Sequence, residues 1–163
     1  MLRTRQLIPP LTMRAPDGRS VRAWDYKQKK NLVIAFLDAG CAPCGEFLRR
    51  VAAGAAELRA RDALALFVFL EPPPAATADA LPPEVVVGAD ISGRAQKAYL
   101  GGDDLPDGAN RRGVFVADRY GELCAAWTPR DHEFPGVAEI LRWLDHLAIA
   151  CEECSPPHWP AEP

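Results

Sequence analysis

Apolar residues along the chain form two kinds of pattern, continuous runs of strand length and stripes of helical spacing. The runs NLVIAFL (31–37) and ALALFVFL (63–70) are rich in branched side chains, which is typical of strands buried on both faces of a sheet. Between them, from Pro43 to Arg61, apolar residues recur at spacings of three and four, as on the buried face of a helix. This order of strand, helix and strand predicts a parallel crossover unit and an α/β fold.

Weaker patterns extend this unit on either side. Residues 9–30 contain a PDG turn between two short alternating stretches, which predicts a β-hairpin ahead of the first buried strand. After the second buried strand, the prolines of residues 71–84 predict a loop without regular structure. We expect a short strand at 84–90 and a brief helix at 92–100 to follow.

The last part of the chain predicts a hairpin and a closing helix. VFVADRYGELCAAW (114–127) has two apolar runs around a turn, so we expect an antiparallel hairpin with Cys124 as a core residue of its second strand. From Pro135 to Ala150 an apolar stripe predicts a helix packed on the sheet, and its members are Val137, Ile140, Leu141, Leu144, Leu147 and Ala148. Together these elements predict a central mixed sheet flanked by helices in one domain, residues 1–150, followed by a Pro-rich tail, residues 151–163.

Length, charge and hydropathy narrow the class of protein. A chain of 163 residues suits a single hydrophobic core. Its net charge of -3 and its lack of a dense Lys/Arg cluster argue against nucleic-acid binding. No apolar run approaches the ~20 residues that cross a bilayer, so we expect no membrane span. The opening MLRTRQLIPPLTMRAPDG lacks the apolar segment of a secretory signal, and the expected location is therefore the cytoplasm.

Cys41 and Cys44 form a Cys-x-x-Cys pair at the junction between the first buried strand and its helix. A helix N-terminus presents unpaired N–H groups and a partial positive charge, which stabilise a thiolate. The second cysteine, one turn later, can then resolve a mixed disulfide or a sulfenic acid on the first. Asp38 and Glu46 lie nearby in the sequence and disfavour a thiolate. The alternatives to a redox dithiol are two inert buried cysteines or half of a zinc site.

Around these residues the sequence resembles a known family. LIPPLTMRAPDGRSVRAWDYKQKKNLVIAFLDAGCAPCGEFLRRV (7–51) and RRGVFVADRYGEL (111–123) resemble the redoxins, the peroxiredoxin and thioredoxin-like proteins of the alkyl hydroperoxide reductase/thiol-specific antioxidant group. The likeness spans residues 7 to about 149. It implies a thioredoxin fold in which the cysteine loop opens a helix. It also implies that Arg112 stabilises a thiolate and polarises peroxide, as the arginine at that position does in peroxiredoxins; the alternative is a solvated loop charge.

Departures from the family patterns leave the substrate open. Gly40 stands where thioredoxin-type disulfide reductases carry a Trp, and Arg112 stands where they carry a cis-Pro. Cys41 and Leu37 replace the Thr and Pro of the peroxiredoxin motif P-x-x-x-T-x-x-C, which aligns the peroxidatic sulfur with Cys44. We therefore expect a thiol-dependent oxidoreductase that reduces peroxides or disulfides. It would need no cofactor and would take electrons from a thiol reductant such as a thioredoxin-type protein.

Cys151 and Cys154 form a second Cys-x-x-Cys pair, after the closing helix and outside the region that resembles redoxins. Such a dithiol could relay electrons to Cys41 and Cys44. With His158 it could instead bind zinc, although no fourth ligand is evident, and a third alternative is an inert tail. The competing prediction for the whole protein is therefore a non-catalytic thioredoxin-like module that binds zinc through its cysteines.

Overall fold

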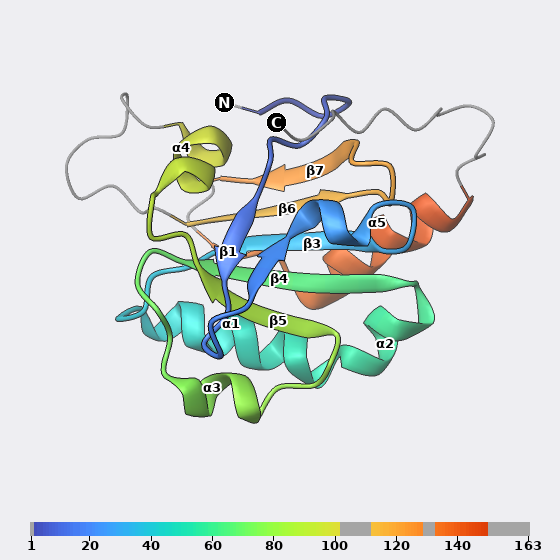
Figure 1. Ribbon diagram of the computed structural model, residues 1–163. Helices are drawn as coiled ribbons and strands as arrows, with labels where there is room; N and C mark the ends of the chain where they lie inside the picture. Colours follow the sequence, from blue (N-terminus) through green and yellow to red (C-terminus); the bar gives the residue numbers. More distant parts are fainter. Residues whose placement is uncertain (1, 102–111, 129–132, 150–163) are drawn as a thin grey trace.

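The computed structural model describes residues 2–101, 112–128 and 133–149. A mixed sheet runs through the centre of this part of the molecule (Figure 1). Its strands lie side by side in the order β2-β1-β5-β4-β3-β6-β7. They are β1 (Thr12–Arg14), β2 (Ser20–Arg22), β3 (Asn31–Phe36), β4 (Ala63–Phe69), β5 (Val85–Ala89), β6 (Gly113–Ala117) and β7 (Leu123–Trp127).

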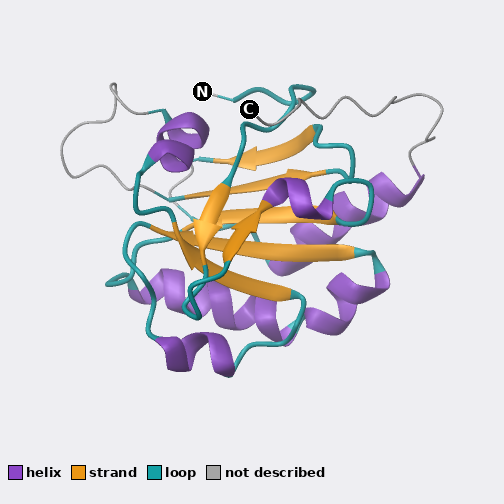
Figure 2. Ribbon diagram, in the orientation of Figure 1, coloured by secondary structure: helices purple, strands orange, loops and turns teal. Residues whose placement is uncertain are grey.

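Helices lie on both sides of the sheet (Figure 2). Two of them, α1 and α2, connect β3 to β4, and α5 comes after β7 in the sequence. The helical elements are η1 (Ala23–Tyr26), α1 (Ala42–Ala53), α2 (Ala55–Ala60), α3 (Ala75–Asp79), α4 (Arg94–Leu100) and α5 (Val137–Ile149). None of the helices in the described ranges is long and apolar enough to cross a membrane.

The predicted crossover unit forms the middle of the sheet. β3 pairs in parallel with β4 along its whole length, from Asn31 opposite Ala63 to Phe36 opposite Val68, and β4 pairs in parallel with β5. β6 then runs antiparallel to β3, and β7 antiparallel to β6. These pairings confirm the mixed α/β sheet and the hairpin expected from residues 114–127.

The N-terminal hairpin is also confirmed, and it crosses the sheet at close range. β1 and β2 pair in the register Met13 opposite Val21, and β1 meets β5 only where Arg14 lies opposite Ala89. Gly88 makes this crossing possible, because a Cβ there would lie 2.8 Å from Met13 Cγ and 3.0 Å from the Arg14 carbonyl oxygen. A glycine is therefore required by the approach of two backbones.

Strand side chains alternate between two separate cores. Val33, Ala35 and the corresponding side chains of β4 and β6 face a cluster that contains α1, α2 and α5. Leu32, Ile34 and Phe36 point the opposite way, into a cluster with the hairpin and α4. Because successive side chains of a strand point to opposite faces, a continuous apolar run serves both cores at once.

Three details differ from the sequence-based expectations. The Pro-rich stretch 71–84 is not wholly irregular, because an Ala-rich segment within it forms α3 with Pro74 as its N-cap, where a missing N–H is tolerated. The helix expected from Pro43 to Arg61 is divided at Gly54 into α1 and α2. On α5, Ala148 is exposed, so the apolar stripe ends earlier than predicted.

We expect Ile140→Ala to destabilise the fold, because Ile140 is only 2% exposed and packs between α5 and the sheet. Removal of buried methyl groups leaves a cavity that costs about 2–5 kcal/mol in the free energy of unfolding, measurable by urea denaturation. Ile149→Ala is the matched control on the same helix, since Ile149 is 83% exposed. Equal losses in the two variants would contradict the described packing of α5.

Candidate active site

The Cys41–Cys44 pair lies where β3 leaves the sheet and α1 begins. Cys41 is the N-cap of α1, with φ -96° and ψ 112°, and Pro43 occupies the first turn. An N-cap residue keeps an extended backbone while the next residues turn into the helix, and a proline there sacrifices no hydrogen bond. The helix thus begins directly after the first cysteine, one residue before the start at Pro43 that the sequence pattern predicted.

The two cysteines are joined as a disulfide, with Cα atoms 5.2 Å apart. The Cys44 backbone N–H donates to Cys41 Sγ across 3.2 Å. Cys44 is 1% exposed and belongs to the core under α1, whereas Cys41 is only partly buried. Cys41 is therefore the more exposed of the two cysteines and has an amide donor directed at its sulfur, whereas Cys44 is enclosed in the core.

Arg112 reaches the same sulfur from β6. It precedes Gly113, which lies opposite Phe36 at the end of β3, so the strand pairing brings Arg112 to the edge where the cysteine loop begins. Its Nη1 donates to Cys41 Sγ across 3.3 Å. The structure therefore brings together Cys41, Cys44 and Arg112, the three residues expected from the sequence to be catalytic.

Phe134, which the sequence pattern did not single out, completes this cluster. Its ring stacks on that of Phe47 in α1, with centroids 4.6 Å apart and planes 7° from parallel. The Arg112 guanidinium lies over Phe134, 5.6 Å from the ring centroid. Phe134 lies outside the periodic stripe of α5; its only sequence signal is an aromatic residue directly before a Pro-Gly pair that precedes a helix.

Glu46 and Asp38, the acidic residues expected to disfavour a thiolate, lie in different surroundings. Glu46 points along the exposed side of α1 and forms an ion pair with Arg50, one turn further on. That cation partly offsets its charge. Asp38 lies in the cysteine loop, where its carbonyl oxygen accepts a hydrogen bond from the Cys41 N–H across 3.3 Å.

Gly113 occupies a position with no room for a side chain. A Cβ there would lie 2.5 Å from Leu100 Cδ2 and 3.1 Å from the ring of Phe115. Leu100 ends α4, which packs on this face of the sheet. The glycine after Arg112 therefore has a packing role, because it lets α4 approach the start of β6.

Cys124 lies on the second strand of the predicted hairpin, but it is half-buried rather than part of the core. Its Sγ lies 3.3 Å from the Glu122 carbonyl oxygen, to which the thiol donates. Burial, followed by the charges of Asp118 and Glu122, raises the pKa of the Cys124 thiol to about 12. This cysteine is therefore protonated at neutral pH and a weak nucleophile.

The described residues test zinc binding by the first cysteine pair but not the electron relay. Within the described ranges, no three or more His, Cys, Asp or Glu side chains gather into a group that could hold a metal ion, and Cys41 and Cys44 bind each other. Zinc binding by this first pair thus has no support in the structure. Cys151, Cys154 and His158 lie outside the described residues, so both the relay and a zinc site in the tail stay predictions.

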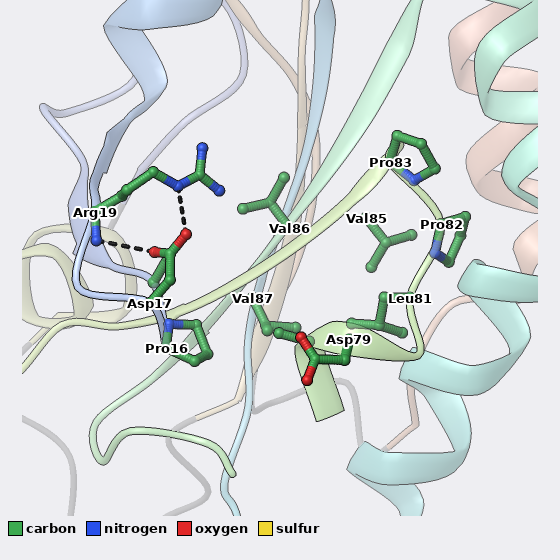
Figure 3. Close-up of a pocket in the computed structure, with 12 residues that line it drawn as sticks. Pro16, Asp17, Arg19, Asp79, Leu81, Pro82, Pro83, Val85, Val86 and Val87 are labelled. Atoms are coloured by element: carbon green, nitrogen blue, oxygen red, sulfur yellow. Dashed lines mark hydrogen bonds and ion pairs between the residues drawn. The ribbon is translucent and has the colours of Figure 1, made fainter. Parts of the chain in front are cut away.

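A groove of about 350 Å³ lies elsewhere, between the β1–β2 turn and the start of β5 (Figure 3). Asp17 and Arg19 form an ion pair on one wall, 2.6 Å apart, and Pro82 and Pro83 lie at the other side. Neither a cysteine nor Arg112 lines this groove. It is therefore not part of the dithiol site.

Comparison with solved structures identifies the fold. Mycobacterium tuberculosis AhpC has a TM-score of 0.72 and 19% identity, over 91% of this chain and 94% of that one. The mitochondrial 2-Cys peroxiredoxin of Plasmodium falciparum has a TM-score of 0.69 and 15% identity, over 89% of this chain and 94% of that one. The thioredoxin domain of a thiol-disulfide oxidoreductase from Bacteroides vulgatus has a TM-score of 0.63 and 17% identity, over 90% of this chain and 98% of that one. No family model and no curated protein matches the sequence.

These similarities confirm the predicted thioredoxin fold. The fold is shared here by peroxiredoxins and a thiol-disulfide oxidoreductase, so it does not by itself choose between their reactions. The choice has to come from the dithiol and the side chains around it.

We expect Gly113→Ala to lower the free energy of unfolding by about 1–3 kcal/mol, because the added methyl group overpacks the contact with Leu100. Gly45→Ala is the matched control in α1, where the nearest atom to a new Cβ, Arg49 Nη1, is 3.7 Å away. Alanine favours a helix, so this variant should gain about 0.5–1 kcal/mol. A Gly113→Ala protein as stable as wild type in urea would contradict the close packing at β6.

Proposed function

We propose that this protein is a thiol-disulfide oxidoreductase in which Cys41 attacks the substrate and Cys44 resolves the intermediate. The observation that carries the proposal is the difference between the two sulfurs. Cys41 is partly exposed and has both the Cys44 N–H and Arg112 directed at its sulfur, whereas Cys44 is 1% exposed. The accessible sulfur is thus also the one whose negative charge the site stabilises.

The reaction follows from this arrangement. The Cys41 thiolate attacks one sulfur of a substrate disulfide, which forms a mixed disulfide and releases the other substrate sulfur as a thiolate that takes up a proton. Cys44 then loses its proton and attacks Cys41 Sγ, which forms the Cys41–Cys44 disulfide and releases the second substrate thiol. The substrate gains two electrons and two protons, and the dithiol loses them.

Peroxide reduction is the second candidate, and the position of Arg112 favours it. A guanidinium that touches the attacking sulfur can also stabilise charge on a peroxide oxygen. The Cys41 thiolate would attack the terminal oxygen, release an alkoxide that takes up a proton, and become a sulfenic acid. Cys44 would then attack this sulfur and release water. The resemblance to the peroxiredoxin motif implies a peroxidatic sulfur at Cys44, but the burial of Cys44 favours Cys41 for this role too.

The remaining parts of the proposal concern partners and location. The oxidised pair needs a thiol reductant, for which a thioredoxin-type protein is the natural class, and no step requires a bound cofactor. A cytoplasmic location, expected from the sequence, stays a prediction.

Cys44→Ser should accumulate a mixed disulfide on Cys41 when the reduced protein meets an aromatic disulfide reagent, because the resolving thiol is missing. Wild type should instead release both halves of the reagent and form the internal disulfide. Cys41→Ser should react slowly, because Cys44 is buried. Mass spectrometry of the intact protein and of its peptides distinguishes these products.

These variants are made with Ser at Cys124, Cys151 and Cys154, so that no other thiol resolves the adduct. Rapid adduct formation on Cys44 in the Cys41→Ser protein would overturn the assignment of roles. Hydrogen peroxide applied to the same set tests the second candidate, since it should leave a sulfenic acid on Cys41 in Cys44→Ser.

Arg112→Gln should shift the pH midpoint of Cys41 alkylation in the reduced protein upward and slow alkylation below that midpoint about ten-fold. The reason is that a cation beside the sulfur favours its charged form, so its removal shifts the onset of thiolate reactivity to higher pH. The rate of Cys41 alkylation by iodoacetamide, followed across pH, measures this midpoint.

Arg142→Gln on α5 is the matched control, because Arg142 is exposed and has no contact with the cysteines. It should leave the midpoint unchanged. An identical midpoint in wild type and Arg112→Gln would show that Arg112 has no role at the thiolate.

A further inference from the structure

Arg112 has an unusual set of partners for a cation beside a reactive sulfur. Its described contacts are the hydrogen bond to Cys41 Sγ and the face of the Phe134 ring. Among residues 2–101, 112–128 and 133–149, no carboxylate forms an ion pair with it. Other arginines in the same ranges do have such partners, for example Arg61 with Asp145.

An aromatic partner differs from a carboxylate in one respect that matters for the thiolate. A carboxylate would orient the guanidinium but would also cancel much of its charge. The face of an aromatic ring attracts a cation through its quadrupole and leaves the net charge of the pair at plus one. Phe134 can therefore hold Arg112 in place while its full charge remains directed at Cys41.

The Phe134 ring is itself held in place by other aromatic side chains. Phe134 stacks on Phe47, which is 3% exposed, and Phe47 meets Phe67 of β4 edge to face with centroids 6.0 Å apart. Phe47 belongs to the same helix that Cys41 caps. The stack thus ties the position of the guanidinium to the helix that carries the sulfur.

We propose that Phe134 is a positioning residue for Arg112 and, through it, for the Cys41 thiolate. The inference rests on the proposed function, in that Arg112 serves the thiolate. Phe134 does not touch the sulfur in the described contacts, so its effect should be smaller than that of Arg112 and should disappear when Arg112 is absent.

The test compares full-length wild type, Phe134→Leu, Phe134→Tyr, Arg112→Gln and the double variant Arg112→Gln/Phe134→Leu. The readout is the pH midpoint of Cys41 alkylation by iodoacetamide in reduced protein. Phe134→Leu keeps an apolar side chain but has no π face, so its midpoint should move upward and Cys41 should react about three-fold more slowly below the midpoint. Phe134→Tyr keeps the ring and should behave as wild type.

The double variant separates positioning from general packing. If Phe134 acts through Arg112, the double variant should have the same midpoint as Arg112→Gln alone, since the effects of coupled residues are not additive. Tyr120→Leu is a matched control, because it removes the ring that faces Arg119, with 5.9 Å between the guanidinium carbon and the ring centroid. It should leave the midpoint unchanged. If Phe134→Leu does not fold, Phe134→Met replaces it.

Each outcome decides the inference. An unshifted midpoint in Phe134→Leu, or an equal shift with and without Arg112, overturns it. Alkylation requires no turnover, so a failure of the proposed function is seen separately. In that case the midpoints of Cys41 alkylation in Phe134→Leu and Arg112→Gln shift as expected, but the wild-type protein reduces neither a disulfide nor a peroxide.

Discussion

The register between β3 and β6 is the constraint on which the site depends. Because Phe36 lies opposite Gly113, the segments just beyond these residues, the cysteine loop and Arg112, lie at the same edge of the sheet. A slip by one residue would turn the side chains of β6 to the opposite faces. The close packing of Leu100 in α4 against Gly113 helps to hold the register. The chemistry at Cys41 is thus set by strand pairing formed well away from the sulfur.

The geometry gives the two cysteines of the pair distinct environments. The N-cap position leaves Cys41 at the surface, while the first turn of the helix carries Cys44 inward onto the sheet. The same turn supplies the amide that donates to the outer sulfur. A three-residue spacing at a helix start is therefore enough to make one thiol accessible and the other protected. Cys124 is not at a helix start, and burial and acidic neighbours raise the pKa of its thiol to about 12. At this place in the fold the cysteine is therefore an unreactive thiol.

The fold was largely predictable from the sequence, and the site was predictable in part. The apolar runs at β3 and β4 have a pattern that few other structures produce, and the cysteine spacing at the following helix identified both sulfurs. The place of Arg112 came from resemblance, since its charge alone has no periodic signal. Phe134 could not be found, because its stacking on Phe47 depends on α1 meeting the segment just before α5, which is far away in the sequence. Helix α3 was missed because flanking prolines concealed a short Ala-rich segment.

Cys44 belongs at once to the dithiol and to the packed interior between the sheet and α1. A closed thermodynamic cycle therefore links two properties that are usually measured apart. The difference in unfolding free energy between oxidised and reduced protein equals the difference in disulfide-forming tendency between the folded and unfolded chain. Any substitution that packs better around one redox form must shift the reduction potential by the corresponding amount. In this protein the interior of the fold is thus a determinant of its electron affinity, even at side chains that no substrate can reach.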